Sequence, residues 1–309
     1  MIESTKPAGR KPVGTLQIDV DDLWVYYESI GRTMPADAEA IAFTQGIPRL
    51  LDLFDRYGVR ATFFVCGQDL PAQRATIFEM VRRGHEVANH SAEHLNGYAR
   101  LSHEALRQDV REAHEKIGDA AGRAPVGFKA PGFSYNPRLP EVLGGLGYKY
   151  DSSQLPTFYA GPIRALQQVL SRGKVDPTHY GRFRYGFTSL RPHPLDAAPW
   201  SDASPQGEGL LEVPVTTVTL FRLPMHSTFV LTAGRWLFDL GLGMTRAFGL
   251  PINYLLHAAD VVDPVSDPAL SSYHFLVQTW EAKQPLYEYM IRQLAESYVI
   301  VPTQEFVQF

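Results

Sequence analysis

Two histidines four residues apart, His90 and His94, are the first candidates for chemistry in this sequence. If residues 89–95 turn helically, both imidazoles lie on one helix face, with Cβ atoms about 5–6 Å apart. Neutral imidazole nitrogens at that spacing suit zinc, copper, nickel or iron. Ser91 stands where the zincin motif needs a glutamate, so that motif is excluded. Two such histidines can also simply share a helix face, and the rest of the sequence has to decide.

Further ionisable residues stand at the ends of predicted strands. Alternating polar and apolar residues predict a strand at 15–21, and Asp19 and Asp21 share its polar face. Three more groups end or follow other predicted strands: His90, Lys129 and His257. In barrels of parallel strands, active sites collect at the carboxyl ends of the strands. We therefore predict a single site at that end.

The elements that must position this site follow from hydrophobic periodicity. From residue 15 to 150 strands and helices alternate, which predicts parallel βαβ units with right-handed crossovers. The predicted strands are 15–21, 59–66, 86–89, 126–129, 148–150, 210–216, 252–256 and 298–301. The predicted helices are 46–58, 72–83, 102–122, 137–147, 234–248 and 285–296. Proline and glycine recur between 153 and 209, which predicts a long loop excursion. Seven or eight mostly parallel strands fit an α/β fold that is a closed or nearly closed barrel.

Composition bounds the class of protein. The chain has 309 residues, is 45% hydrophobic and carries a net charge of −4, so nothing in it indicates nucleic-acid binding. We expect a flexible N-terminal tail at 1–13 and one domain at 14–309. The first residues lack the apolar core of a secretory signal and Cys66 has no partner for an intrachain disulfide, so we expect a cytoplasmic location. The apolar region with Trp236, Leu237, Phe238 and Leu240 is interpreted as a core helix, with a peripheral membrane contact as the alternative.

Taken together, the motifs resemble the polysaccharide deacetylase family, the NodB-homology domain, in its branch with an Asp-x-Asp first motif. They are IDVDD at 18–22, GIPRLLDLFDRYGVRATFFVCG at 46–67, HEVANHSAEH at 85–94, GFKAPGF at 127–133, YDSS at 150–153 and NYLLHAAD at 253–260. The resemblance runs from about residue 14 to residue 304 and implies a distorted (β/α) barrel. This branch resembles cytoplasmic peptidoglycan-deacetylase-like and allantoinase-like proteins and the deformylase of lipid-linked aminoarabinose.

The resemblance also implies a role for each candidate residue. A divalent metal, commonly zinc with cobalt or nickel as alternatives, is expected on Asp21, His90 and His94. Asp19 is expected to be the general base and His257 the general acid, and the backbone N–H of Gly132 is expected to donate to the oxyanion. Asp22 stays open as an alternative base, because a bend of the chain at Asp21 would bring it into the site.

One position departs from the family pattern. Lys129 stands where the family usually has the arginine that orients the catalytic aspartate. Lysine keeps the charge but lacks the planar fork of arginine, so we expect the base to be held less rigidly. His226 and Trp24 are further candidates to line a sugar pocket, with ordinary loop packing as the alternative for both.

The sequence thus predicts a metal-dependent hydrolase that removes an N-acyl group, most simply N-acetyl, from an amino sugar. The expected substrate is nucleotide-linked, lipid-linked or a small glycoside. One alternative is an allantoinase-like hydrolase of cyclic amides. The other is a metal-bearing carbohydrate-binding protein that has lost catalysis. The sequence leaves the oligomeric state open.

Overall fold

A curled, mostly parallel sheet forms the centre of the computed structural model, which describes residues 11–170, 178–195 and 209–309. The strands are β1 (Val13–Val20), β2 (Thr62–Val65), β3 (Glu86–Asn89), β4 (Gly127–Phe128), β5 (Tyr150–Asp151), β6 (His193–Pro194), β7 (Leu211–Glu212), β8 (Asn253–His257) and β9 (Val299–Ile300). Their order is β6-β7-β5-β4-β3-β2-β1-β8, with β9 beside β1, and in the described part only β6 pairs antiparallel. The predicted distorted barrel of mostly parallel strands is confirmed, and the two-residue strands account for the higher count.

The chain after β7 brings the two ends of this sheet toward each other. The N–H of Val215 donates to Gln154 O (3.1 Å), just beyond β5, and the next residue, Thr216, donates to Asn253 O (2.9 Å) in β8. The sheet is therefore curled rather than flat, and the carboxyl ends of its parallel strands open at the same end.

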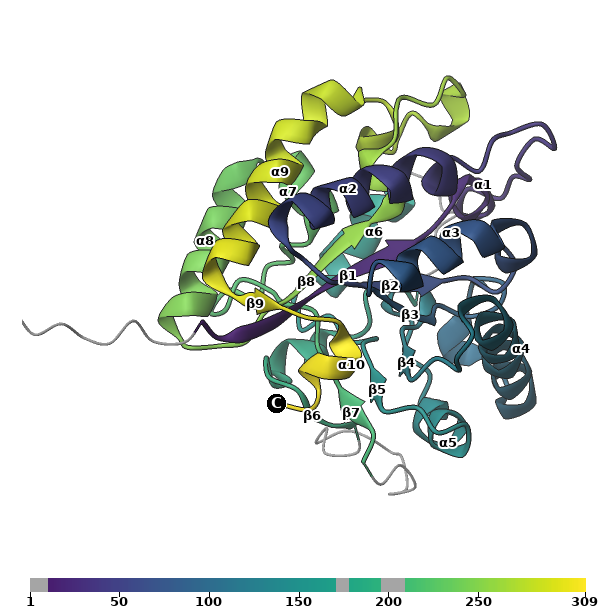
Figure 1. The fold of residues 1–309 in the computed structure, drawn as a ribbon, viewed down its shortest axis with the longest axis horizontal. Helices are drawn as coiled ribbons and strands as arrows, with labels where there is room; N and C mark the ends of the chain where they lie inside the picture. The colour runs from purple at the N-terminus through teal and green to yellow at the C-terminus, as the bar shows by residue number, and fades with distance from the viewer. Residues whose placement is uncertain (1–10, 171–177, 196–208) are drawn as a thin grey trace, which may run out of the picture.

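Helices pack around this sheet (Figure 1). They are α1 (Leu23–Ser29), α2 (Ile47–Tyr57), α3 (Leu70–Arg82), α4 (His103–Ala121), α5 (Leu139–Gly145), α6 (Ala160–Leu170), α7 (Ser227–Ala233), α8 (Arg235–Ala247), α9 (Trp280–Ser297) and α10 (Thr303–Phe306). Local signals set several of the ends: Gly58 ends α2 with φ +64°, and the Ser102 hydroxyl accepts the Ala105 N–H at the start of α4. None of the described helices is long and apolar enough to cross a bilayer.

The apolar region after residue 229 forms α7 and α8. Leu237 and Phe238 of α8 are buried, as predicted for a helix that packs on the core. Trp236 and Leu240 lie on the outer side of α8, and the Trp236 indole donates to the Ala233 carbonyl. The helix thus contributes one face to the core, and its contact with a membrane stays a prediction.

Two stretches differ from the sequence-based predictions. The predicted helix at 285–296 begins at Trp280, because the Thr279 hydroxyl caps it by accepting the Ala282 N–H, and Pro285 lies inside it. The described parts of the predicted loop excursion contain α6 and β6, which periodicity did not indicate. Residues 1–10 of the predicted tail at 1–13 lie outside the described residues.

Candidate active site

Three predicted metal ligands converge at the carboxyl end of the barrel. Asp21 directly follows β1, and His90 and His94 lie in the loop after β3. One ligand atom from each lies within 4.8 Å of the other two. Asp21 Oδ1 is 3.5 Å from His90 Nε2 and 3.7 Å from His94 Nε2. The structure thus brings together the three side chains that the sequence motifs singled out.

The loop achieves this without a helix, so the helical arrangement considered for residues 89–95 does not form. Ser91 and His94 have left-handed backbones, with φ of 75° and 47°. The Asn89 side chain accepts the Ser91 N–H (2.7 Å), and the Ser91 hydroxyl accepts the His94 N–H (2.9 Å). These side chains compete with helical hydrogen bonds and fold the loop back. The two imidazole rings still meet, with centroids 5.2 Å apart.

The donor set fits a divalent metal. The His90 ring bonds the Lys129 carbonyl through Nδ1 (2.8 Å), which turns Nε2 toward Asp21. Asp21 Oδ1 is buried and accepts no hydrogen bond of standard length from the described part of the chain, as expected for an oxygen that serves a cation. Burial lowers the pKa of His94 to about 4, so its imidazole is neutral and can act as a ligand near pH 7. Two imidazoles and one carboxylate leave coordination positions for water and substrate.

Asp19 lies beside this cluster in a buried ion pair. Lys129 Nζ donates to Asp19 Oδ1 at 2.8 Å, and the Lys129 side chain is 1% exposed and packs over the Phe64 ring. Lys129 is therefore not a surface lysine. Asp22 points elsewhere, since its side chain accepts the Leu23 N–H (2.7 Å) and caps α1. The geometry favours Asp19 over Asp22 as the carboxylate available for proton transfer.

His257 faces Asp19 from the neighbouring strand. β1 and β8 pair with Asp19 opposite His257. Burial lowers the pKa of His257, but the Asp260 carboxylate, 3.5 Å from Nδ1, and the charges of Asp19 and Asp21 together outweigh it and raise the pKa to about 9. Asp260 is fully buried and also accepts the His257 N–H (3.0 Å) and the Ser227 hydroxyl. Sequence reasoning missed Asp260, although its place three residues after His257 was a signal.

Of the two candidate pocket residues, His226 has the environment that better suits a contact with a ligand. Its side chain is 4% exposed, and its ring meets the His257 ring edge-on, with centroids 5.5 Å apart. Neither of its ring nitrogens has a hydrogen-bond partner among the described residues. Phe133 and Phe229 supply the neighbouring rings, at centroid distances of 6.2 and 4.8 Å. Its two ring nitrogens could therefore bond a ligand, and the role of His226 in a sugar pocket stays a prediction.

Trp24 has a different environment. It belongs to α1 rather than to a loop, and its Nε1–H donates to Asp69 Oδ1 (2.9 Å). Its ring meets the His94 ring edge-on, with centroids 6.4 Å apart. Burial raises the pKa of Asp69 to about 7, and the indole hydrogen bond opposes this rise. Trp24 therefore packs against His94, one of the metal-ligand candidates, and its indole N–H already donates to Asp69.

Gly132 occupies a position that only glycine fits. Its φ is +53°, and an added Cβ would lie 2.6 Å from Cδ2 of His179. The Tyr180 N–H donates to the Gly132 carbonyl (2.8 Å), so the excursion packs directly on this turn. Sequence reasoning gave His179 no role, because nothing local connects it to Gly132.

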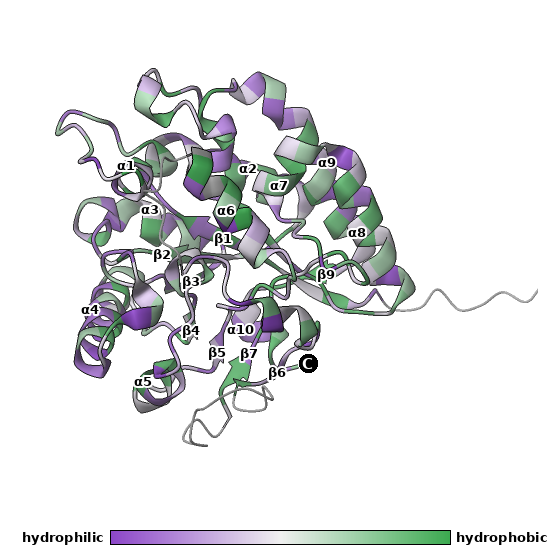
Figure 2. Cartoon of the chain, turned by 180° about the vertical axis from the view of Figure 1, so that it is seen from behind, coloured by the Kyte–Doolittle hydropathy of each residue, from purple (hydrophilic) through white to green (hydrophobic). Residues whose placement is uncertain are grey.

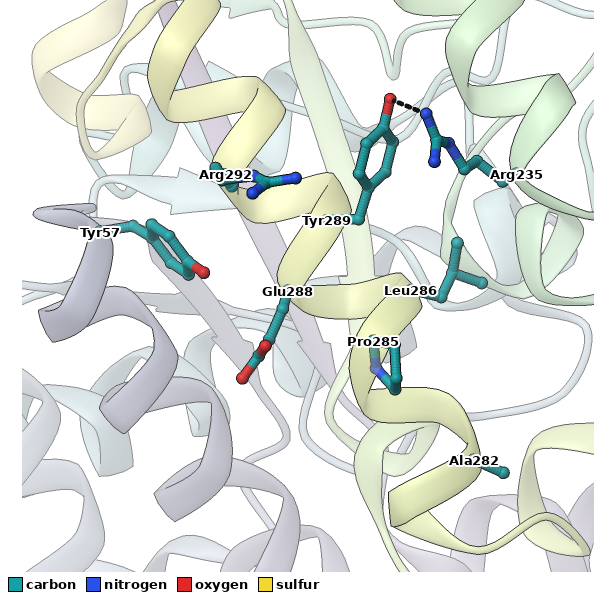
Figure 3. Close-up of a pocket in the computed structure, with 8 residues that line it drawn as sticks. All are labelled: Tyr57, Arg235, Ala282, Pro285, Leu286, Glu288, Tyr289 and Arg292. Atoms are coloured by element: carbon teal, nitrogen blue, oxygen red, sulfur yellow. Dashed lines mark hydrogen bonds between the residues drawn. The ribbon is translucent and has the colours of Figure 1, made fainter.

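A hollow on the outside of the barrel is separate from this site. It has a volume of about 490 Å³ and lies between α2, α8 and α9. Figure 3 shows its lining, in which the Arg235 guanidinium lies over the Tyr289 ring and donates to its hydroxyl (2.8 Å). None of the predicted site residues lines it.

Comparison with known proteins places the fold. Residues 29–150 match the family model for polysaccharide deacetylase. The peptidoglycan deacetylase of Helicobacter pylori is 37% identical over 140 residues, which are 44% of this chain and 47% of that protein. A putative polysaccharide deacetylase from Mycobacterium smegmatis superposes with a TM-score of 0.61 at 21% identity, over 98% of this chain and 91% of that one. Puue allantoinase superposes with a TM-score of 0.58 at 14% identity, over 99% of this chain and 93% of that one. At these identities the two superpositions show the fold alone, and this chain spans about half the length of the H. pylori relative.

Proposed function

We propose that this chain, whose residues 29–150 match the polysaccharide deacetylase family model, is a metal-dependent hydrolase that removes an N-acyl group, most simply N-acetyl, from an amino sugar. The observation that carries the proposal is the cluster of Asp21, His90 and His94, with Asp19 and His257 at paired positions of the adjacent strands β1 and β8. The relatives' names supply the reaction class, and the cluster supplies the chemistry.

An amide carbonyl is a poor electrophile, so the reaction needs both activated water and a stabilised oxyanion. Asp21, His90 and His94 would hold a divalent ion, which would supply Lewis acidity toward the carbonyl and the attacking water. Asp19 takes the proton of the attacking water, and the Lys129 ammonium holds its carboxylate in place. The Gly132 N–H donates to the developing oxyanion, a contact worth about 3–4 kcal/mol per donor in other hydrolases.

The leaving amine must be protonated before the intermediate collapses. His257 carries the proton at neutral pH, because the nearby carboxylates, Asp260 first among them, raise its pKa to about 9. In this proposal the acid and the base come from paired positions on adjacent strands, so both can reach one reacting carbon. In the same proposal His226 contacts the bound substrate through its unused nitrogens, and Trp24 forms a wall of the pocket beside His94.

The substrate class that we propose follows from the cytoplasmic location that we expect for the chain. In the cytoplasm the chain would meet an amino sugar that is nucleotide-linked, lipid-linked or part of a small glycoside, rather than a mature polymer. Zinc is the metal that we expect, with cobalt or nickel as substitutes.

Metal content and acyl release test the proposal together. We expect near-stoichiometric metal in the wild type, its loss in His90→Ala, and acetate release from N-acetylated sugars by the wild type only. His103→Ala, at an exposed histidine outside the cluster, is the matched control and should retain both properties. No metal uptake by the folded wild type would refute the mechanism. Turnover of cyclic ureides without acetate release would favour the allantoinase-like reaction, and metal with sugar binding but no turnover would favour a protein without catalysis.

A further inference from the structure

Large apolar side chains lie exposed on two segments of the excursion and on a turn that contacts it. Six of them form what we call the apolar face: Leu166 and Val169 of α6, Phe183 and Phe187 of the 3-10 turn at 183–187, and Leu220 and Phe221 of the turn at 218–222. Each is between 53% and 75% exposed to solvent. Figure 2 shows α6 on the viewer's side, with hydrophobic residues along it. So many large exposed apolar side chains indicate an interaction surface.

Specific contacts hold the three segments of the apolar face together. The Phe158 ring, just before α6, meets Phe183 and Phe187 at centroid distances of 5.4 and 4.9 Å. Arg164 of α6 donates to the carbonyls of residues 179 and 181. Arg222 donates to the carbonyl of residue 188 (3.1 Å). The three segments that carry these side chains are therefore held beside one another.

The fixed charges on the described segments that carry the apolar face have a single sign. Among the described residues within 152–195 and 213–222, the side chains that carry a fixed charge are all arginines: Arg164, Arg182, Arg184, Arg191 and Arg222. No lysine, aspartate or glutamate occurs among the described residues of these two stretches, although the whole chain carries a net charge of −4. Such a surface is complementary to an anionic partner.

The same segment connects the apolar face to the candidate active site. The Tyr180 N–H donates to the Gly132 carbonyl (2.8 Å), and the Tyr180 and Phe133 rings lie 6.2 Å apart. Residues 178–188 therefore run from the turn that bears the expected oxyanion donor to Phe183 and Phe187. A surface that receives the apolar face would lie beside the site.

We propose that the apolar face docks onto an anionic phospholipid bilayer and brings the site to an amino sugar that is carried on a lipid. Aromatic and aliphatic side chains enter the boundary between headgroups and acyl chains, while arginines pair with the phosphates. A second copy of the chain fits less well, because a symmetric contact would set two arginine-rich faces against each other. The substrate class rests on the proposed function, whereas the docking does not.

Vesicle sedimentation tests the docking with the full chain. We expect the wild type to bind vesicles of phosphatidylcholine with phosphatidylglycerol, to bind phosphatidylcholine alone much less, and to dissociate at high salt. Binding should fall at least about tenfold in Phe183→Ser/Phe187→Ser, because two side chains that would leave water are replaced. Phe78→Ser on α3 is the matched control, since Phe78 and Phe187 are each 64% exposed, and it should bind like the wild type.

A charge variant and an activity measurement complete the test. Arg182→Glu/Arg184→Glu should also lose binding to anionic vesicles, so the result does not depend on one variant folding well. Both double variants should release acetate from soluble N-acetyl sugars at the wild-type rate. Wild type that ignores anionic vesicles would overturn the docking, as would a concentration-dependent dimer that the serine variant abolishes. Vesicle binding without acyl release by any form would overturn the proposed function and leave the docking in place.

Discussion

Replacing Asp260 with asparagine should shift the pH dependence of catalysis to lower pH. The Asp260 carboxylate is buried 3.5 Å from His257 Nδ1, and together with Asp19 and Asp21 it outweighs the effect of burial to raise the pKa of His257 to about 9. A general acid works while it is protonated, so its contribution is present below that pKa and is lost as the pH rises through it. Asparagine keeps the shape and one acceptor oxygen but removes the charge.

The structure sets the size of the shift. At an effective dielectric constant of about 20, two unit charges 3.5 Å apart interact by about 5 kcal/mol, or about 3 pKa units. Asparagine retains part of the hydrogen bonding, so we expect the alkaline limb to move down by about 2–3 units. Asp19 and Asp21 also raise the pKa of His257, and a bound cation would offset part of their field. The difference between variant and wild type is therefore more informative than either limb alone.

The assay is acyl release from a soluble N-acetyl sugar between about pH 5 and 10, with kcat and kcat/KM fitted separately. A smaller folded fraction would scale the whole profile without moving its limb, so the limb reports the pKa even if the variant is less stable. Asp239→Asn, at an exposed carboxylate paired with Arg235, is the matched control and should leave the profile unchanged. An alkaline limb that stays in place in Asp260→Asn would refute the assignment of His257 as an acid tuned by Asp260.

Three further changes test other parts of the site. Lys129→Met leaves Asp19 buried without its counter-ion and should reduce the free energy of unfolding by about 3–5 kcal/mol in denaturant titrations. Lys129→Arg should keep activity with a shifted pH optimum. Asn89→Ala removes three buried hydrogen bonds, should cost about 3 kcal/mol by the same titration, and should weaken metal retention by the loop that bears His94. His226→Phe should raise KM without moving the pH limbs; an unchanged KM would assign His226 to packing.

The order of elements could be predicted from the sequence because each βαβ unit carries its own signals. Residues Glu86–Asn89 form β3 within the predicted bounds, and Ser102 and Gly122 flank α4 as their types indicate. The candidate site residues could be predicted for the same reason. The carboxyl ends of parallel strands lie at one edge of the sheet, so polar residues at those ends must meet. These inferences need only local periodicity and topology.

Features that depend on side-chain competition or distant contact could not be predicted in the same way. The loop after β3 turns because Asn89 and Ser91 bond neighbouring N–H groups, and helical spacing alone gives no sign of this. The α6 helix lies in a stretch rich in proline and glycine. The contact between His179 and Gly132 joins residues from separate parts of the chain, and nothing in either local sequence indicates it.

The ion pair of Lys129 and Asp19 shows how closure of the barrel and the proposed chemistry depend on each other. β4 and β1 are three strand steps apart, with β3 and β2 between them, which is about 14 Å in a flat sheet. Lysine and aspartate side chains together would not span that distance, yet Nζ and Oδ1 are 2.8 Å apart. The sheet must therefore curl over Phe64 of β2 for the base to gain its counter-ion. A short side chain at 129 would lose both the charge and this connection across the barrel, so we expect this position to require a long cationic side chain.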